Sequence, residues 1–195
     1  MNLISNCCVA GYLYKIYNKQ FLNPFQWCFI EPKDLILLMR KYNIINYNNI
    51  DLVKSTEHKD TYVLIVDNII KLKFIHYIED KNVVFKKISH NVKSNKIKEY
   101  IIQKYKERLK RMFKEKPIFI YIDNLHKSTE NSAWEFIKEK TKFKRILITN
   151  NHSLIKYRNE NLMIIIDDNK PQTNNNRPFD YANRYSKMIL NFISK

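Results

Sequence analysis

Three apolar segments, separated by helical patterns, constrain the fold of this chain more than any other feature of its sequence. Residues 117–123, 145–149 and 162–167 are apolar on both sides, as strands are when both of their faces are covered. A helix predicted over residues 128–142 separates the first two segments, and strands that alternate with helices form parallel sheets. We therefore predict an α/β fold with three layers, in which helices flank a mostly parallel sheet.

The two ends of the chain extend this pattern. Residues 2–5 predict a short strand, residues 9–17 and 32–42 predict helices with apolar stripes, and residues 180–194 predict a closing amphipathic helix. No internal repeat is visible, and the length suits one large domain. Residues 1–195 are therefore expected to form a single α/β domain.

The middle of the chain predicts antiparallel strands. Residues 50–54, 61–66 and 71–78 are rich in β-branched and aromatic side chains, and Asp67-Asn68 suits a hairpin turn between the last two. We expect an antiparallel hairpin that is inserted into the domain or lies at one edge of the parallel sheet.

The chain contains a single glycine, Gly11, which excludes several classes of nucleotide-binding protein. A phosphate-binding loop, a dinucleotide fingerprint and a nucleophile elbow each need more than one glycine. A phosphate-containing ligand would therefore be held without a glycine-rich loop.

The hydrophobic fraction of the chain is 45%, which is high enough for a packed core.

The charge of the chain points to an anionic partner without naming one. Lys and Arg number 35 against 19 Asp and Glu, which gives a formal net charge of +16. The excess is almost entirely lysine and is spread along the chain, whereas arginine, which reads bases bidentately, is sparse. This pattern disfavours a dedicated nucleic-acid binder and suits an anionic or sugar-containing small-molecule substrate.

Cysteine usage and the N-terminus predict a reduced, cytoplasmic protein. Cys7, Cys8 and Cys28 are odd in number and two of them are adjacent, so we expect no disulfide framework. No cysteine or histidine spacing predicts a zinc site, and the sequence indicates neither a cofactor nor an oligomeric state. The first residues lack the basic region of a secretory signal, and no apolar run is long enough to span a bilayer.

Cys8 is the predicted nucleophile because of its position. It follows the strand at residues 2–5 and lies in the first turn of the next predicted helix, where free backbone N–H groups stabilise an anion. The same field lowers the pKa of a thiol and favours the reactive thiolate. The alternative is that Cys7 and Cys8 are small buried residues at a strand–helix junction.

A cysteine nucleophile needs a base, and His76 is the first candidate among five histidines. It is embedded in an apolar strand, so it is either a hydrogen-bonded core residue or a site residue. His126 is the second choice, and the others resemble solvated loop residues. Asp123 ends the strongest central strand, where it could orient a histidine, bind a sugar hydroxyl or cap the following loop. The predicted catalytic residues are Cys8, His76 and Asp123.

The substrate is expected beyond the carboxyl ends of the parallel strands, where open α/β sheets place their sites. Arg108 and Arg111 lie three residues apart on a predicted helix over residues 95–114, so they share a face. They either hold a phosphate or carboxylate, or belong to a solvated basic face. Trp27 lies in a turn-rich segment and offers a stacking surface. The predicted substrate-binding residues are Asn6, Asn23, Trp27, Arg108, Arg111 and Asn150.

Residues 4–14, Ile-Ser-Asn-Cys-Cys-Val-Ala-Gly-Tyr-Leu-Tyr, resemble the start of a bacterial family, the domain-of-unknown-function family nineteen-nineteen. That family typically shows Ser-Asn-Asn-Cys, two or three residues, a glycine and an aromatic residue. In this register Cys8 matches the family cysteine, and Cys7 replaces an asparagine. Shorter similarities follow, in the family's order, at residues 23–25, 34–36, 76–77, 105–111, 120–123 and 146–150.

The chain departs from the family pattern at two places. Members often carry two glycines after the cysteine, where this chain has Ala10-Gly11. They often continue Arg-Asp-Gly-Cys after the strand that ends at Asp123, where this chain has Asn-Leu-His. The second departure leaves the function of that loop open.

The resemblance implies a cytoplasmic protein of bacterial surface polysaccharide biosynthesis, concerned with capsule, lipooligosaccharide or exopolysaccharide. Together with Cys8 and His76 it leads us to expect a transferase or hydrolase that acts on a sugar or acyl-sugar substrate. A non-catalytic glycan- or nucleic-acid-binding module is one alternative. A papain-like cysteine peptidase is another, because residues 24–27, Pro-Phe-Gln-Trp, are similar to a Pro-Phe-x-Trp segment of such a family.

Overall fold

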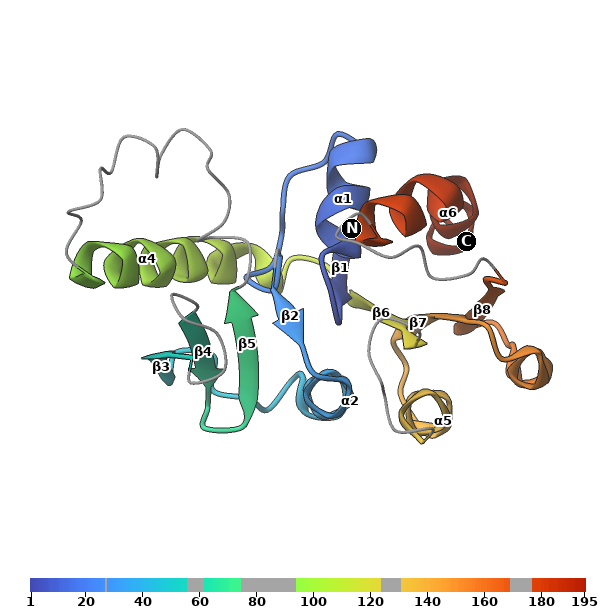
Figure 1. The fold of residues 1–195 in the computed structure, drawn as a ribbon, viewed down its shortest axis with the longest axis horizontal. Coiled ribbons are helices and arrows are strands. Elements are labelled where there is room, and N and C mark those ends of the chain that lie inside the picture. Colours follow the sequence, from blue (N-terminus) through green and yellow to red (C-terminus); the bar gives the residue numbers. More distant parts are fainter. Residues whose placement is uncertain (27, 56–61, 75–93, 124–130, 169–176) are drawn as a thin grey trace.

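The chain folds into two four-stranded sheets that lie side by side, one parallel and one antiparallel (Figure 1). This mixed α/β arrangement, with helices on both faces of the parallel sheet, confirms the predicted fold class. The computed structural model describes residues 1–26, 28–55, 62–74, 94–123, 131–168 and 177–195.

The parallel sheet consists of β1 (Asn2–Ser5), β6 (Pro117–Ile122), β7 (Lys144–Thr149) and β8 (Leu162–Ile166). The order across the sheet is β1-β6-β7-β8, and every neighbouring pair is parallel. All residues of β6 and nearly all of β7 are buried, as expected for strands with two covered faces.

Helices cover both faces of this sheet (Figure 1). On one face lie α1 (Val9–Ile16) and α6 (Arg177–Ile193), and on the other lie α2 (Pro32–Lys41) and α5 (Ser132–Lys138). None of the helices that the structure describes has both the length and the apolar character of a membrane span.

Alternation along β6 produces the two cores. Ile118 and Ile120 pack in the cluster that contains side chains of α1 and α6, whereas Phe119 and Tyr121 pack in the cluster that contains α2 and α5. Because successive side chains of a strand point to opposite faces, a strand with a core on each side must be apolar at every position.

The antiparallel sheet consists of β2 (Phe29–Ile30), β3 (Ile50–Lys54), β4 (Tyr62–Val66) and β5 (Ile70–Phe74), in the order β2-β5-β4-β3. It is inserted in the sequence between β1 and β6. The expected hairpin is present as β4 and β5, and two further strands extend it into a separate sheet.

The hairpin turns where the sequence indicated. Asp67 and Asn68 have φ values of 52° and 58°, in the left-handed region that Asp and Asn tolerate better than most residues. The N–H of Ile69 donates to the carbonyl of Val66 at 3.0 Å and closes the turn.

The two sheets share a core. Leu64 of β4, Tyr105 of α4 (Ser94–Met112) and Phe119 of β6 belong to one cluster of buried side chains. The backbone N–H of Ile30 also donates to the carbonyl of Asn6 at 3.1 Å, so β2 lies beside the carboxyl end of β1. This contact brings the antiparallel sheet to the edge where the site is expected.

Three local features differ from the sequence-based expectation. Helix α5 ends at Lys138 rather than at residue 142, and residues 128–130, where the predicted helix begins, lie outside the described residues. Strand β2 and the short 3-10 helix η2 (His152–Tyr157) were not expected. Residues 75–78, the end of the strand predicted over residues 71–78, lie outside the described part of the chain.

Candidate functional site

Polar residues end or follow each parallel strand at the carboxyl edge of the sheet. Asn6 follows β1, Asp123 follows β6, Thr149 ends β7 and Asp167 follows β8. Since the strands are parallel neighbours, these residues lie along one edge, as the topology rule for open α/β sheets predicts.

A hydroxyl from the neighbouring strand orients Asp123. The Thr149 Oγ1 donates to Asp123 Oδ2 at 2.9 Å and accepts from the backbone N–H of Asn151 at 3.1 Å. The Tyr121 hydroxyl donates to Asp123 Oδ1 at 3.4 Å. Because Thr149 is fully buried, this contact fixes the Asp123 carboxylate at the edge of the sheet.

Replacing Thr149 by valine should lower the free energy of unfolding by about 1–2 kcal/mol. The valine keeps the shape but leaves the Asn151 N–H without its acceptor. Urea denaturation measures the change, and Thr149→Ser, which keeps the hydroxyl, should lose less. Equal stability of Thr149→Val and the native chain would contradict this role of the hydroxyl.

Asn6 joins the ends of two strands. Its Nδ2 donates to the carbonyl of Ile122 at 3.0 Å, and its Oδ1 accepts from the N–H of Ile122 at the same distance. The side chain is fully buried. These bonds extend the pairing of β1 and β6, so the observed contacts of Asn6, a predicted substrate-binding residue, are structural.

Asn23 likewise contacts the protein itself. It is fully buried, and its Nδ2 donates at 2.7 Å both to Asn2 Oδ1 and to the carbonyl of Leu3. β1 is an edge strand of the parallel sheet, and unpaired backbone groups of an edge strand need partners when they are buried. Asn23, predicted to bind substrate, therefore completes the hydrogen bonding of β1.

Cys8 lies directly before α1, at the position predicted for the nucleophile, with 5% of its surface exposed. Burial raises the pKa of its thiol to about 12, while a hydrogen bond from its own backbone N–H lowers it by less. The shift is opposite to the one expected for a thiol at a helix N-terminus, because desolvation outweighs the field of the helix. The thiol is protonated at neutral pH.

Cys28 connects Cys8 with Arg108. Burial raises the pKa of the Cys28 thiol well above its ordinary value; the positive charge of Arg108 opposes this shift and Cys8 adds to it. The guanidinium carbon of Arg108 lies 5.4 Å from the centre of the Phe21 ring. Two predicted site residues that are far apart in the sequence thus act electrostatically on the same buried thiol.

The remaining predicted residues are dispersed. Arg111 is half-buried, and its Nε has no hydrogen-bond partner among the described residues. Its positive charge helps to lower the pKa of Glu107, and it is not among the causes of the pKa shift of Cys28. Asn150 is exposed after β7. Trp27, His76 and His126 lie outside the described residues.

Sequence reasoning missed a histidine–carboxylate pair at the same edge. His152 Nε2 lies 2.7 Å from Asp168 Oδ1, and both side chains are exposed. Next to it, Arg184 of α6 donates to the buried Asp167 carboxylate at 2.8 Å. Its position in the sequence could have identified this pair, because His152 lies three residues after the end of β7.

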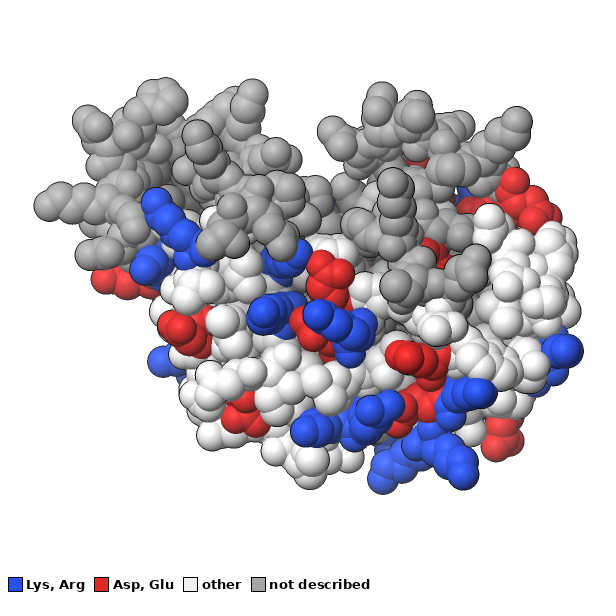
Figure 2. Space-filling model, turned by 60° about the horizontal axis from the view of Figure 1, so that its bottom comes forward, with Lys and Arg blue, Asp and Glu red and all other residues white. Residues whose placement is uncertain are grey.

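No metal centre accompanies these residues in the ranges that the structure describes: no three His, Cys, Asp or Glu side chains gather there as metal ligands. In the view of Figure 2, basic side chains are scattered among acidic and uncharged ones. On that face they do not form one continuous patch.

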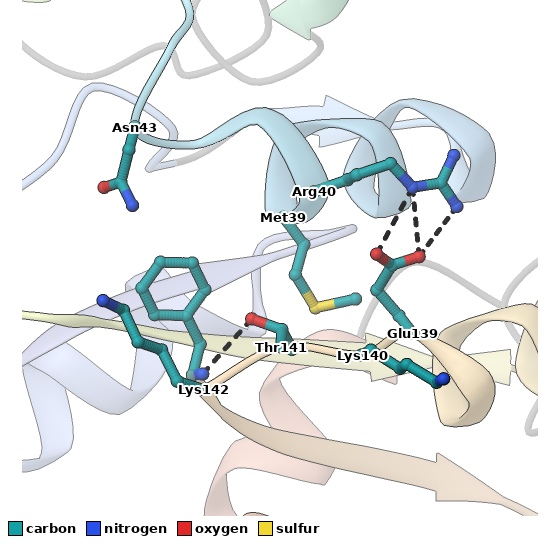
Figure 3. Close-up of a pocket in the computed structure, with 8 residues that line it drawn as sticks. Met39, Arg40, Asn43, Glu139, Lys140, Thr141 and Lys142 are labelled. Carbon is teal, nitrogen blue, oxygen red and sulfur yellow. Dashed lines mark hydrogen bonds and ion pairs between the residues drawn. The ribbon is translucent and has the colours of Figure 1, made fainter.

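One pocket lies at the opposite, amino edge of the sheet, between α2 and the segment before β7 (Figure 3). Its volume is about 560 Å³. Arg40 reaches from α2 to Glu139 and donates to its carboxylate through Nε and Nη2, the shortest bond being 2.7 Å. Because Arg40 is already paired with Glu139, its positive charge is less available to a ligand in this pocket.

Comparison with known proteins matches the N-terminal part of the chain to one family model. The model of the family described as "Domain of unknown function (DUF1919)" matches residues 1–97. This segment contains Cys8, α2 and the antiparallel sheet, and it ends inside α4 before Arg108. No curated protein matches the chain. Residues 1–97 are therefore similar to the family DUF1919, whose function is unknown.

Proposed function

We propose that this chain is a cytoplasmic enzyme of bacterial surface polysaccharide biosynthesis in which Cys8 transfers or hydrolyses a group on a sugar or acyl-sugar. The observation that carries the proposal is the position of Cys8 between β1 and α1, with Arg108 acting on the adjacent Cys28 thiol. A cationic side chain at that place would stabilise the negative charge that develops during nucleophilic attack.

The raised pKa of Cys8 restricts the mechanism. Because the thiol is protonated at neutral pH, a base must take its proton while Sγ attacks the substrate carbon. The bond from that carbon to the leaving oxygen breaks, and this oxygen receives the proton. Water or an acceptor hydroxyl then attacks the enzyme-bound carbon and restores the thiol. We assign the base to His76 and the orientation of the acceptor hydroxyl to Asp123.

The test is to trap the covalent intermediate. The protein is incubated with O-acetylated monosaccharides and with p-nitrophenyl acetate, and modified peptides are identified by mass spectrometry. An adduct on Cys8 is expected in the native chain and in Cys7→Ala, the matched control, but not in Cys8→Ala. Cys8→Ala should also lower turnover by roughly a thousandfold or more. Full turnover by Cys8→Ala would disprove the proposal.

A non-catalytic glycan-binding module is the second candidate, and the buried, protonated thiol of Cys8 favours it. This function predicts that monosaccharides or oligosaccharides bind equally well to the native chain and to Cys8→Ser, without turnover. Nucleic-acid binding instead predicts a steep loss of affinity with salt.

A further inference from the structure

A second pocket lies between residues 45–48 and α4, and we call it the α4 groove. Its volume is about 540 Å³, within the range of small-molecule sites. Asn2, at the start of β1, donates to the carbonyl of Met112 at the end of α4, so the groove lies near the amino edge, away from Cys8. Its lining residues are Ile45, Asn46, Tyr47, Asn48, Lys106, Leu109, Lys110 and Phe113.

Hydrogen bonds hold the wall of the groove opposite α4. The Tyr47 hydroxyl donates to the carbonyl of Tyr42 at 2.7 Å, and the Tyr105 hydroxyl donates to the carbonyl of Tyr47 at 3.1 Å. The N–H of Asn46 donates to Asp67 Oδ2 at 3.1 Å. A ligand would therefore meet a wall that is already formed, which lowers the entropic cost of binding.

The groove presents an aromatic ring. Phe113 is 59% exposed, yet its ring packs on Tyr47 and Tyr42 with centroid distances of 5.5 and 5.9 Å. Ile45 and Leu109 are buried beneath the surface of the groove. An exposed ring that its neighbours hold in place offers a face on which a flat ligand ring can stack.

Two lysines lie beside this ring, and neither has an anionic partner among the residues that the structure describes. Lys106 and Lys110 lie one helical turn apart, and within the described chain neither forms an ion pair, whereas Lys104 pairs with Glu107 at 3.1 Å. None of the described residues that line the groove is acidic. Like charges four residues apart destabilise a helix, and an anion between them would remove that cost.

We propose that the α4 groove binds a nucleoside phosphate. Its base stacks on Phe113, and its phosphates lie between Lys106 and Lys110. The ring and the two cations match the two chemical parts of such a ligand, and a volume of about 540 Å³ suits one nucleotide better than a strand. This site is independent of Cys8 and of the reaction proposed for it.

Isothermal titration of the full chain with uridine diphosphate and adenosine diphosphate tests the proposal. Saturable binding with one site is expected, with pyrophosphate and uridine each binding at least about tenfold more weakly, since each lacks one part of the ligand. Lys106→Gln/Lys110→Gln should weaken binding about tenfold, and Phe113→Ala about tenfold. Lys187→Gln/Lys195→Gln, which removes the same charge from exposed positions on and after α6, should leave affinity unchanged.

Three results would overturn the inference. Pyrophosphate binding as tight as that of the diphosphates would exclude stacking on Phe113. Tight binding of a ten-nucleotide oligothymidylate that uridine diphosphate does not displace would assign the surface to single-stranded nucleic acid. Unchanged affinity in folded Lys106→Gln/Lys110→Gln, checked by circular dichroism, would place the site elsewhere. Cys8→Ala should bind the diphosphates with native affinity. The binding test therefore does not depend on whether Cys8 carries out the proposed reaction.

Discussion

Replacing Asn23 by leucine is expected to lower the free energy of unfolding by about 3 kcal/mol, through loss of buried hydrogen bonds. The Asn23 side chain is fully buried and makes four of them. Its Nδ2 donates to Asn2 Oδ1 and to the carbonyl of Leu3, and its Oδ1 accepts from the Phe25 N–H and from Gln26 Nε2.

The size of the effect follows from the groups that leucine would leave unpaired. Gln26 Nε2 also donates to the carbonyl of Leu3 at 2.8 Å, so this carbonyl keeps a partner. The Phe25 N–H and Asn2 Oδ1 lose the bonds that Asn23 supplies. An unsatisfied buried polar group costs about 1–3 kcal/mol, and two such groups account for the expected loss.

Urea denaturation followed by circular dichroism measures this change. Asn43→Leu is the matched control, because Asn43 is exposed in a turn and the substitution should alter stability by less than about 0.5 kcal/mol. If Asn23→Leu stays within 1 kcal/mol of the native chain, the amide network does not hold the edge of β1, and Asn23 is again open to a role in binding.

The parallel sheet could be predicted because its determinants are local. Residues 117–122 and 144–149 are apolar at almost every position, and this continuous pattern occurs where two faces are covered. The hairpin between β4 and β5 was predictable for the same reason, since Asp67-Asn68 is a local turn signal.

Elements determined by distant contacts could not be predicted in this way. Strand β2 has two residues and exists through its pairing with β5 and the bond from Ile30 to Asn6. Helix α5 ends at Lys138 although no glycine or proline follows it. Its next residue, Glu139, is held by Arg40 of α2, a contact that no local pattern encodes.

The location of the candidate site was predictable, whereas the state of its residues was not. The topology rule placed Asn6, Asp123 and Thr149 at one edge, and the structure brings Asp123 and Thr149 into contact. A sequence does not show which polar side chains are buried against the backbone, so Asn6 and Asn23 resembled ligand contacts. For the same reason the sequence predicted a lowered pKa for the Cys8 thiol, whereas burial raises it.

The Cys8 thiol is expected to react with iodoacetamide roughly three orders of magnitude more slowly in the folded protein than in the urea-unfolded chain near neutral pH. Burial raises its pKa to about 12, whereas an unperturbed cysteine has a pKa of about 8.5, and only the thiolate reacts. The rate should rise about tenfold per pH unit between pH 7 and 10, because the thiol stays far below its pKa.

Peptide-resolved mass spectrometry measures this rate for Cys8 without substitutions, and the unfolded chain supplies the control for the same thiol. A rate that is high and levels off near pH 7 would mean that the field of the helix N-terminus outweighs burial, which would make Cys8 a preformed thiolate. The slow rate expected here leaves one route to catalysis, in which the proposed base, His76, takes the proton of the Cys8 thiol once a substrate is bound. If an O-acetylated sugar acylates Cys8 at neutral pH while iodoacetamide does not alkylate it, substrate binding is what activates the thiol.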